Sequence, residues 1–293
     1  MNRMLFPSDF SDVSKKAFHY TLDFARAIRS ELTVLHSQAS DSYVRRFLFH
    51  RWQRHQIWQN FADFCRDEQG QIPPDVSLMI RRGSLEDQID LACQSKNFRY
   101  IAIGKDHSYR SFLPSPGSKT SRLIANTYCP VLIVPSQVHY QGISNILIVD
   151  AHYRQMENAV QENILSLGLR FQANLHYLNI HHAPASWEFS KEAFTNNQNY
   201  LVQKTIPADL AAEELLEYIR EQQIDLLVML TKRRELYEQL FRLSNERGVL
   251  PCTDLPLLVF HNNYLQTRID PGMARPAPRE SELPPAVGQV AQG

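Results

Sequence analysis

The stretch IAIGKDHSYRSFLPSPGSKTSRLIANTYCPVLIVP, residues 101–135, decides the fold of this chain. An apolar run at residues 100–103 leads into it and another at residues 131–134 ends it, with a polar loop and a helical pattern at residues 118–126 between them. Each apolar run is short and continuous, which predicts a strand that is buried on both faces. Strand, helix and strand in that order are typical of a mostly parallel sheet with helices on both sides.

The same alternation continues on both sides of this stretch. Upstream, the sequence predicts strands at residues 4–6, 32–35 and 76–80 and helices at residues 17–28, 43–66 and 85–93. Downstream, it predicts strands at residues 146–149, 175–178, 226–230 and 257–260 and helices at residues 157–167 and 210–221. The whole chain up to about residue 263 is therefore expected to be α/β.

Segments of the first half have counterparts in the second half. Residues 4–6 match residues 146–148, residues 100–104 match residues 226–230, and residues 130–133 match residues 256–259. We therefore predict two tandem, doubly wound, mostly parallel-sheet domains at residues 1–137 and 143–263. Residues 264–293 are rich in Pro, Gly, Ala and Gln, which predicts a disordered tail.

Composition narrows the class of protein. The 293 residues suffice for two domains, and 31 basic side chains balance 31 acidic ones. A net charge of zero disfavours an overall electrostatic affinity for nucleic acid or anionic lipid. No apolar stretch approaches the roughly 18 residues that a membrane span needs, so we expect a cytoplasmic protein that binds neither nucleic acid nor membrane.

The four cysteines, Cys65, Cys93, Cys129 and Cys252, are far apart in the sequence and form no CxxC motif. This spacing predicts buried free thiols in a reducing compartment, with no metal site and no disulfide framework. The familiar nucleophile, zinc-hydrolase and Walker motifs are also absent from the sequence, so we expect no enzymatic activity.

The loop after the predicted strand at residues 100–103 has the features of an anion site. Gly104 at the strand end lets a ligand approach the backbone, and Gly117-Ser118 opens a helix whose first amides lack partners within the helix. Such amides, together with the positive end of the helix dipole, suit a phosphate group.

These residues resemble the universal stress protein family. Its nucleotide-binding members carry Gly, two residues, Gly, nine residues, Gly and then Ser or Thr in this loop. Here Gly104, Gly117 and Ser118 keep the spacing, and His107 stands where the second glycine would be. The segments LFPSDFSDVSKKAFHYTLDFARAIRSELTVLHS and RRGSLEDQI also resemble the start and the third strand of the family.

The resemblance implies a universal stress protein-like, adenine nucleotide α-hydrolase-like fold and a regulatory protein of the stress response. Its first domain would hold ATP or another adenine nucleotide with Mg²⁺. In that site Pro7, Val34 and Ser37 would line the adenine, Asp9 would contact the ribose, and Gly83 would lie near the pocket. Gly104, Gly117 and Ser118 would receive the phosphates, and His107 would either block them or donate a hydrogen bond to them.

Each of these residues also has a purely structural interpretation. Asp9 is equally suited to capping the first helix, Gly117-Ser118 to a plain helix entry, and Gly83 to a strand-ending turn. The alternative function is a scaffold that has lost nucleotide binding and acts through contacts with other proteins.

The second copy is degenerate at the positions that match the glycines. Leu230, Arg233 and Leu243 replace all three, so we expect no nucleotide there. Universal stress proteins commonly pair through their last strand, so the resemblance implies an intramolecular pseudo-dimer of the two domains, with or without further pairing as a homodimer.

The helix predicted at residues 43–66 mixes arginines with aromatic side chains. This composition fits either a binding surface or a packed helix, and the spacing favours packing. Its apolar stripe is Ile57, Trp58, Phe61, Phe64 and Cys65.

Overall fold

The structure is a computed structural model. The residues that it describes are 2–38, 50–67, 69–94, 98–105, 127, 129–150, 158–181, 201–207, 211–231 and 255–261. The predicted helix at residues 118–126, the first part of the predicted helix at residues 43–66 and the predicted tail at residues 264–293 lie outside them.

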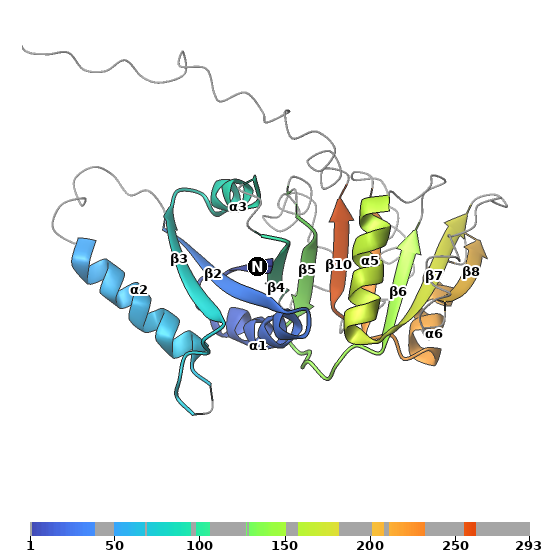
Figure 1. The fold of residues 1–293 in the computed structure, drawn as a ribbon, viewed down its shortest axis with the longest axis horizontal. Coiled ribbons are helices and arrows are strands. Elements are labelled where there is room, and N and C mark those ends of the chain that lie inside the picture. The colour runs from blue at the N-terminus through green and yellow to red at the C-terminus, as the bar shows by residue number, and fades with distance from the viewer. Residues whose placement is uncertain are drawn as a thin grey trace, which may run out of the picture.

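One ten-stranded sheet runs across the molecule in the order β3-β2-β1-β4-β5-β10-β9-β6-β7-β8 (Figure 1). The strands of the first half are β1 (Asn2–Pro7), β2 (Ser30–Gln38), β3 (Val76–Arg82), β4 (Tyr100–Lys105) and β5 (Val131–Pro135). Those of the second half are β6 (Asn145–Asp150), β7 (Asn174–His181), β8 (Leu201–Pro207), β9 (Leu226–Thr231) and β10 (Leu257–His261).

The two halves of the sheet have the same strand order, read outward from the centre. Within each half all neighbouring strands are parallel, whereas β5 and β10 pair antiparallel, with Leu132 opposite Leu258. The mostly parallel α/β architecture predicted from the sequence is therefore confirmed. The domain boundaries at residues 137 and 143 stay a prediction, because the sheet continues across them.

The sheet is buried on both faces, and each face has a core that includes residues of both halves. The first core holds the inner sides of α1 (Asp12–Ala27), α2 (His50–Cys65) and α5 (Asn158–Phe171). The second core holds those of α3 (Leu85–Gln94) and α6 (Ala211–Glu221). Burial of both faces explains why most strands read as continuous apolar runs.

Side chains from the two halves meet directly in the first core. The hydroxyl of Tyr100 on β4 donates a hydrogen bond to Oδ1 of Asn163 on α5, and both residues are buried. The rings of Phe24 on α1 and Phe171 on α5 lie 5.4 Å apart. The halves are thus joined by side-chain packing as well as by the β5–β10 ladder.

Two features differ from the sequence-based expectation. The strand β8 is not among the predicted elements, although β7 pairs with it over its whole length. The predicted stripe of α2 is buried at Ile57, Phe61, Phe64 and Cys65, but Trp58 is 54% exposed. Ile57 and Phe61, on either side of it in the sequence, are buried, so Trp58 lies beside the buried stripe and not within it.

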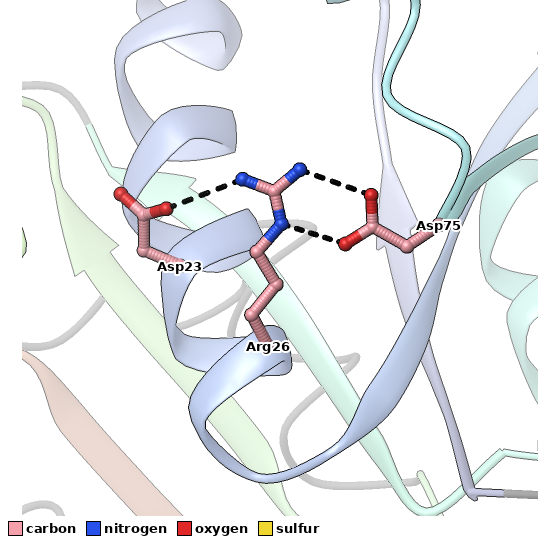
Figure 2. A network of polar contacts seen from close by, with 3 residues as sticks. All are labelled: Asp23, Arg26 and Asp75. Atoms are coloured by element: carbon pink, nitrogen blue, oxygen red, sulfur yellow. Dashed lines mark hydrogen bonds and ion pairs between the residues drawn. The ribbon is translucent and has the colours of Figure 1, made fainter.

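Local signals fix the ends of α1. Ser11 is the N-cap, and its hydroxyl oxygen accepts a hydrogen bond from the backbone N–H of Ser14. In the last turn Arg26 donates from Nε and one Nη to the carboxylate of Asp75, at 2.7 and 3.0 Å, and another Nη lies 3.7 Å from Asp23 (Figure 2). This ion pair ties the helix to the turn that leads into β3.

Replacing Tyr100 by Phe is expected to lower the free energy of unfolding by about 1–2 kcal/mol, because a buried amide oxygen then loses a hydrogen-bond donor. Urea denaturation followed by fluorescence and by circular dichroism measures the change. Tyr140→Phe, at a half-buried ring that packs against Tyr20, is the control. An equal loss in both variants would contradict a specific role for the Tyr100–Asn163 bond.

Replacing Asp75 by Asn is expected to cost about 0.5–1 kcal/mol at pH 7, since the ion pair is partly exposed. The hydrogen bond from Arg26 lowers the pKa of Asp75. Its contribution is therefore present above about pH 4, its ordinary pKa, and is lost as the pH falls through the lower folded-state value. Denaturation at pH 7 and at pH 2–3 should show a difference between wild type and Asp75→Asn only at pH 7, and Asp23→Asn should have a smaller effect than Asp75→Asn at pH 7.

Candidate functional site

The first half of the sheet has its switch in strand order between β1 and β4. These two parallel strands are neighbours, with Met4 opposite Tyr100. β2, which follows β1 in the chain, lies on one side of this pair, and β5, which follows β4, lies on the other side. Pro7 ends β1, and Gly104 lies at the end of β4 opposite Val134 of β5. In open α/β sheets the carboxyl ends of strands at such a switch form the usual ligand crevice.

The turn after β1 is held down on the neighbouring strand. The N–H of Ser8 donates to the carbonyl of Leu35 in β2 at 3.0 Å, and the Ser8 hydroxyl accepts from the N–H of Phe10 at 2.9 Å. Phe10 has a φ of 64°, which is unusual for a residue with a side chain. The turn therefore has a defined shape at the edge of the sheet.

An aromatic stack fixes this unusual backbone. The Phe10 ring stacks on His36 of β2, with centroids 4.7 Å apart, and meets Phe64 of α2 edge-on at 5.5 Å. His36 Nδ1 lies 3.1 Å from the Ser8 carbonyl oxygen, so this nitrogen carries the proton and donates. Sequence reasoning missed Phe10 and His36, and the one signal in the sequence is that Phe10 is an aromatic residue inside a polar turn.

Asp9 lies exposed at the carboxyl edge of the sheet. Its Oδ1 accepts hydrogen bonds of 3.0 Å from the Ser11 N–H and the Ser14 hydroxyl. Partial burial opposes ionisation, but these hydrogen bonds outweigh it and lower the pKa of Asp9. The carboxylate is thus ionised near neutral pH and supports the start of α1, while Ser11 is the cap itself.

Ser37 and Gly83 come together at the ends of β2 and β3. The Ser37 hydroxyl donates to the Gly83 carbonyl at 2.7 Å, and the Gly83 N–H donates to the Gln38 carbonyl at 2.9 Å. Gly83 has a φ of 115°, and a Cβ there would lie 3.2 Å from the Gln88 amide nitrogen. The turn itself therefore requires glycine at this position.

The other predicted site residues are not among the described residues at this edge of the sheet. Val34 lies in the core, opposite Phe6 in the register of β1 and β2, and has no exposed surface. His107, Gly117 and Ser118 lie outside the described residues. The structure thus brings Pro7, Asp9, Ser37, Gly83 and Gly104 to the carboxyl ends of four adjacent strands.

The described residues include neither a metal cluster nor a membrane-spanning helix. Within those ranges, no group of three or more His, Cys, Asp and Glu side chains is arranged to hold a metal ion. None of the helices in the same ranges combines the length and the apolar character that crossing a bilayer requires.

Comparison with solved structures supports the architecture. A universal stress protein from Archaeoglobus fulgidus DSM 4304 superposes with a TM-score of 0.63 at 17% identity, over 89% of this chain and 98% of that one. A protein of unknown function from Pseudomonas aeruginosa PAO1 superposes with a TM-score of 0.53 at 15% identity, over 92% and 96%. At these identities the similarity concerns the fold alone.

Comparison of sequences identifies the family. No curated protein matches the chain. The model of the universal stress protein family matches residues 1–135, which include β1 to β5 and the whole edge described above. The resemblance seen in the sequence is thus confirmed for residues 1–135, which match the universal stress protein family.

Proposed function

We propose that this protein is a stress-response regulator that binds an adenine nucleotide, with ATP as the leading candidate, at the carboxyl edge of β1 to β4. The observation that carries the proposal is the convergence of Pro7, Asp9, Ser37 and Gly104 around the switch in strand order. The match of residues 1–135 to the universal stress protein family supports the same ligand class.

Each described residue has a suitable property for that ligand. The ionised Asp9 carboxylate is exposed and is suited to accept a hydrogen bond from a ribose hydroxyl. Gly104 has no side chain, so a phosphate or a base can approach the backbone there. Pro7 and Ser37 are half-buried at the ends of their strands, where they would border the adenine.

The phosphates would be held by the segment that starts at Gly104. Gly117 and Ser118 would supply backbone amides and a hydroxyl, as the family spacing suggests, and the phosphates themselves would coordinate Mg²⁺. The imidazole of His107 would donate to a phosphate oxygen from the place of the second glycine. No general base is assigned, so we propose a ligand that is held and released rather than turned over.

The second half has a different role in this proposal. Leu230 lies in β9 opposite Asp150 of β6, where the sequence match puts the counterpart of Gly104. A phosphate is not expected to bind at a leucine in the place of that glycine. This half would act as the permanent partner of the first through the β5–β10 ladder. The pair would work in the cytoplasm, as expected for a chain without a predicted membrane span.

Isothermal titration of the full chain with Mg-ATP is expected to give saturable heat with a Kd below 1 mM. Asp9→Ala should weaken binding about tenfold, the effect of losing about 1.4 kcal/mol of charge-assisted hydrogen bonding. Asp12→Ala, also acidic and exposed at the start of α1, should leave Kd unchanged. The midpoint of thermal unfolding of both variants checks that the helix start is intact.

The scaffold hypothesis makes the opposite prediction. If no heat is observed up to millimolar Mg-ATP and small molecules released from gently purified protein include no nucleotide, the proposed ligand is wrong. Substituting Gly117 by a bulky residue separates the two functions, because a scaffold keeps its partner binding whereas a nucleotide site loses its ligand.

A further inference from the structure

Two cysteines that are far apart in the sequence lie together in the second core. Cys93 is in the last turn of α3, and Cys129 precedes β5. Each is only 5% exposed, and both are hydrogen-bonded to the same residue, Thr127. The structure has both as free thiols.

A small polar network surrounds the pair. The Thr127 hydroxyl donates to the Cys93 sulfur at 3.5 Å and accepts from the Cys129 N–H at 3.3 Å. The Cys129 sulfur lies 3.4 Å from the Phe98 carbonyl oxygen. The network positions Cys129 beside Cys93 and directs a hydroxyl donor at the Cys93 sulfur.

The two thiols are not equivalent. The hydrogen bond from Cys129 lowers the pKa of Cys93 despite burial and the nearby negative charge of Asp90, and Thr127 adds to the effect. The same pairing raises the pKa of Cys129. Cys93 is therefore the thiol that ionises first, and a thiolate is the nucleophilic form.

We propose that Cys93 and Cys129 form a hydroperoxide-sensitive dithiol, with Cys93 as the attacking sulfur and Cys129 as the resolving one. In the first step the Cys93 thiolate attacks a peroxide oxygen, so that an S–O bond forms, the O–O bond breaks and the leaving oxygen takes up a proton. Cys93 is then a sulfenic acid and the peroxide is reduced.

In the second step the Cys129 sulfur attacks the Cys93 sulfur. The S–S bond forms, the S–O bond breaks, and hydroxide leaves with the Cys129 proton as water. One hydroperoxide thus oxidises both thiols to an intrachain disulfide. The bond would link α3 to the start of β5, on either side of β4 in the sequence.

Cys65 is the natural internal control. It is 1% exposed in α2, and burial raises its pKa to about 12, so neither a thiolate nor a sulfur partner among the described residues favours its oxidation. Low exposure by itself therefore does not make a thiol reactive in this chain. The limited exposure of Cys93 predicts oxidation over minutes to hours rather than seconds.

The test uses the reduced full chain, treated with hydrogen peroxide in the folded state. Remaining thiols are alkylated after denaturation and the peptides are mapped by mass spectrometry. We expect a Cys93–Cys129 linked peptide that disappears on reduction, with Cys65 and Cys252 recovered in alkylated form. Cys93→Ser and Cys129→Ser each remove this peptide, and the cysteine that remains in each variant should not form a linked peptide with Cys65 or Cys252.

The order of the steps has its own readout. In Cys129→Ser, Cys93 should accumulate as a sulfenic acid that dimedone labels, whereas in Cys93→Ser the remaining Cys129 should stay unlabelled. A peptide linked through Cys65 or Cys252, or no linked peptide while unfolded protein oxidises readily, would overturn the proposal. The peptide map of the wild-type protein tests the proposal even if a variant fails to fold. No nucleotide is added, so the result does not depend on the proposed function.

Discussion

The antiparallel pairing of β5 with β10 is the constraint on which the rest of the structure depends. Both strands consist almost entirely of apolar residues that are buried, VLIVP and LLVFH. As free edges they would expose unpaired backbone groups along an apolar strand, which is a template for aggregation. Pairing them satisfies those groups and lets each core continue from one half to the other. The outer edge at β3 instead ends in Arg81 and Arg82, which are exposed and charged.

The same sheet order produces the candidate site. Parallel strands put their carboxyl ends on one edge, so residues distant in sequence, such as Asp9, Ser37 and Gly104, lie along it. The edge is held rigidly where β1 meets β2, because the turn bearing Asp9 is bonded to Leu35 and stacked on His36. A ligand at this edge would meet a preorganised floor, which reduces the ordering cost of binding.

The parallel strands were predictable because burial on both faces leaves a direct signature in the sequence. β8 was not predicted, since its sequence LVQKTIP, at the edge of the sheet, mixes polar and apolar residues. The internal match contained the missing information: extending the match of residues 100–104 with 226–230 upstream puts residues 76–80 on residues 202–206, within β8.

The stacking of Phe10 on His36 and the meeting of Cys93 with Cys129 depend on backbone placement, so residue spacing in the sequence does not reveal them. Of the six predicted site residues that the structure describes, five lie along one edge of the sheet, because the family's spacing encodes strand ends rather than side-chain contacts.

The two halves carry different constraints because they share a core. A half that contributes β10, α5 and α6 to that core has to retain its apolar faces, but its own strand switch can have Leu230 in place of a glycine. In the first half, one strand, β4, has both to pack against the second half and to leave room for a ligand. Near its start Tyr100 is bonded to Asn163 of the second half, and near its end Gly104 lies at the candidate site. The strand that would contact a ligand is thus also the strand that side-chain contacts hold to the second half. A ligand that displaced β4 would therefore have to disrupt packing in the shared core.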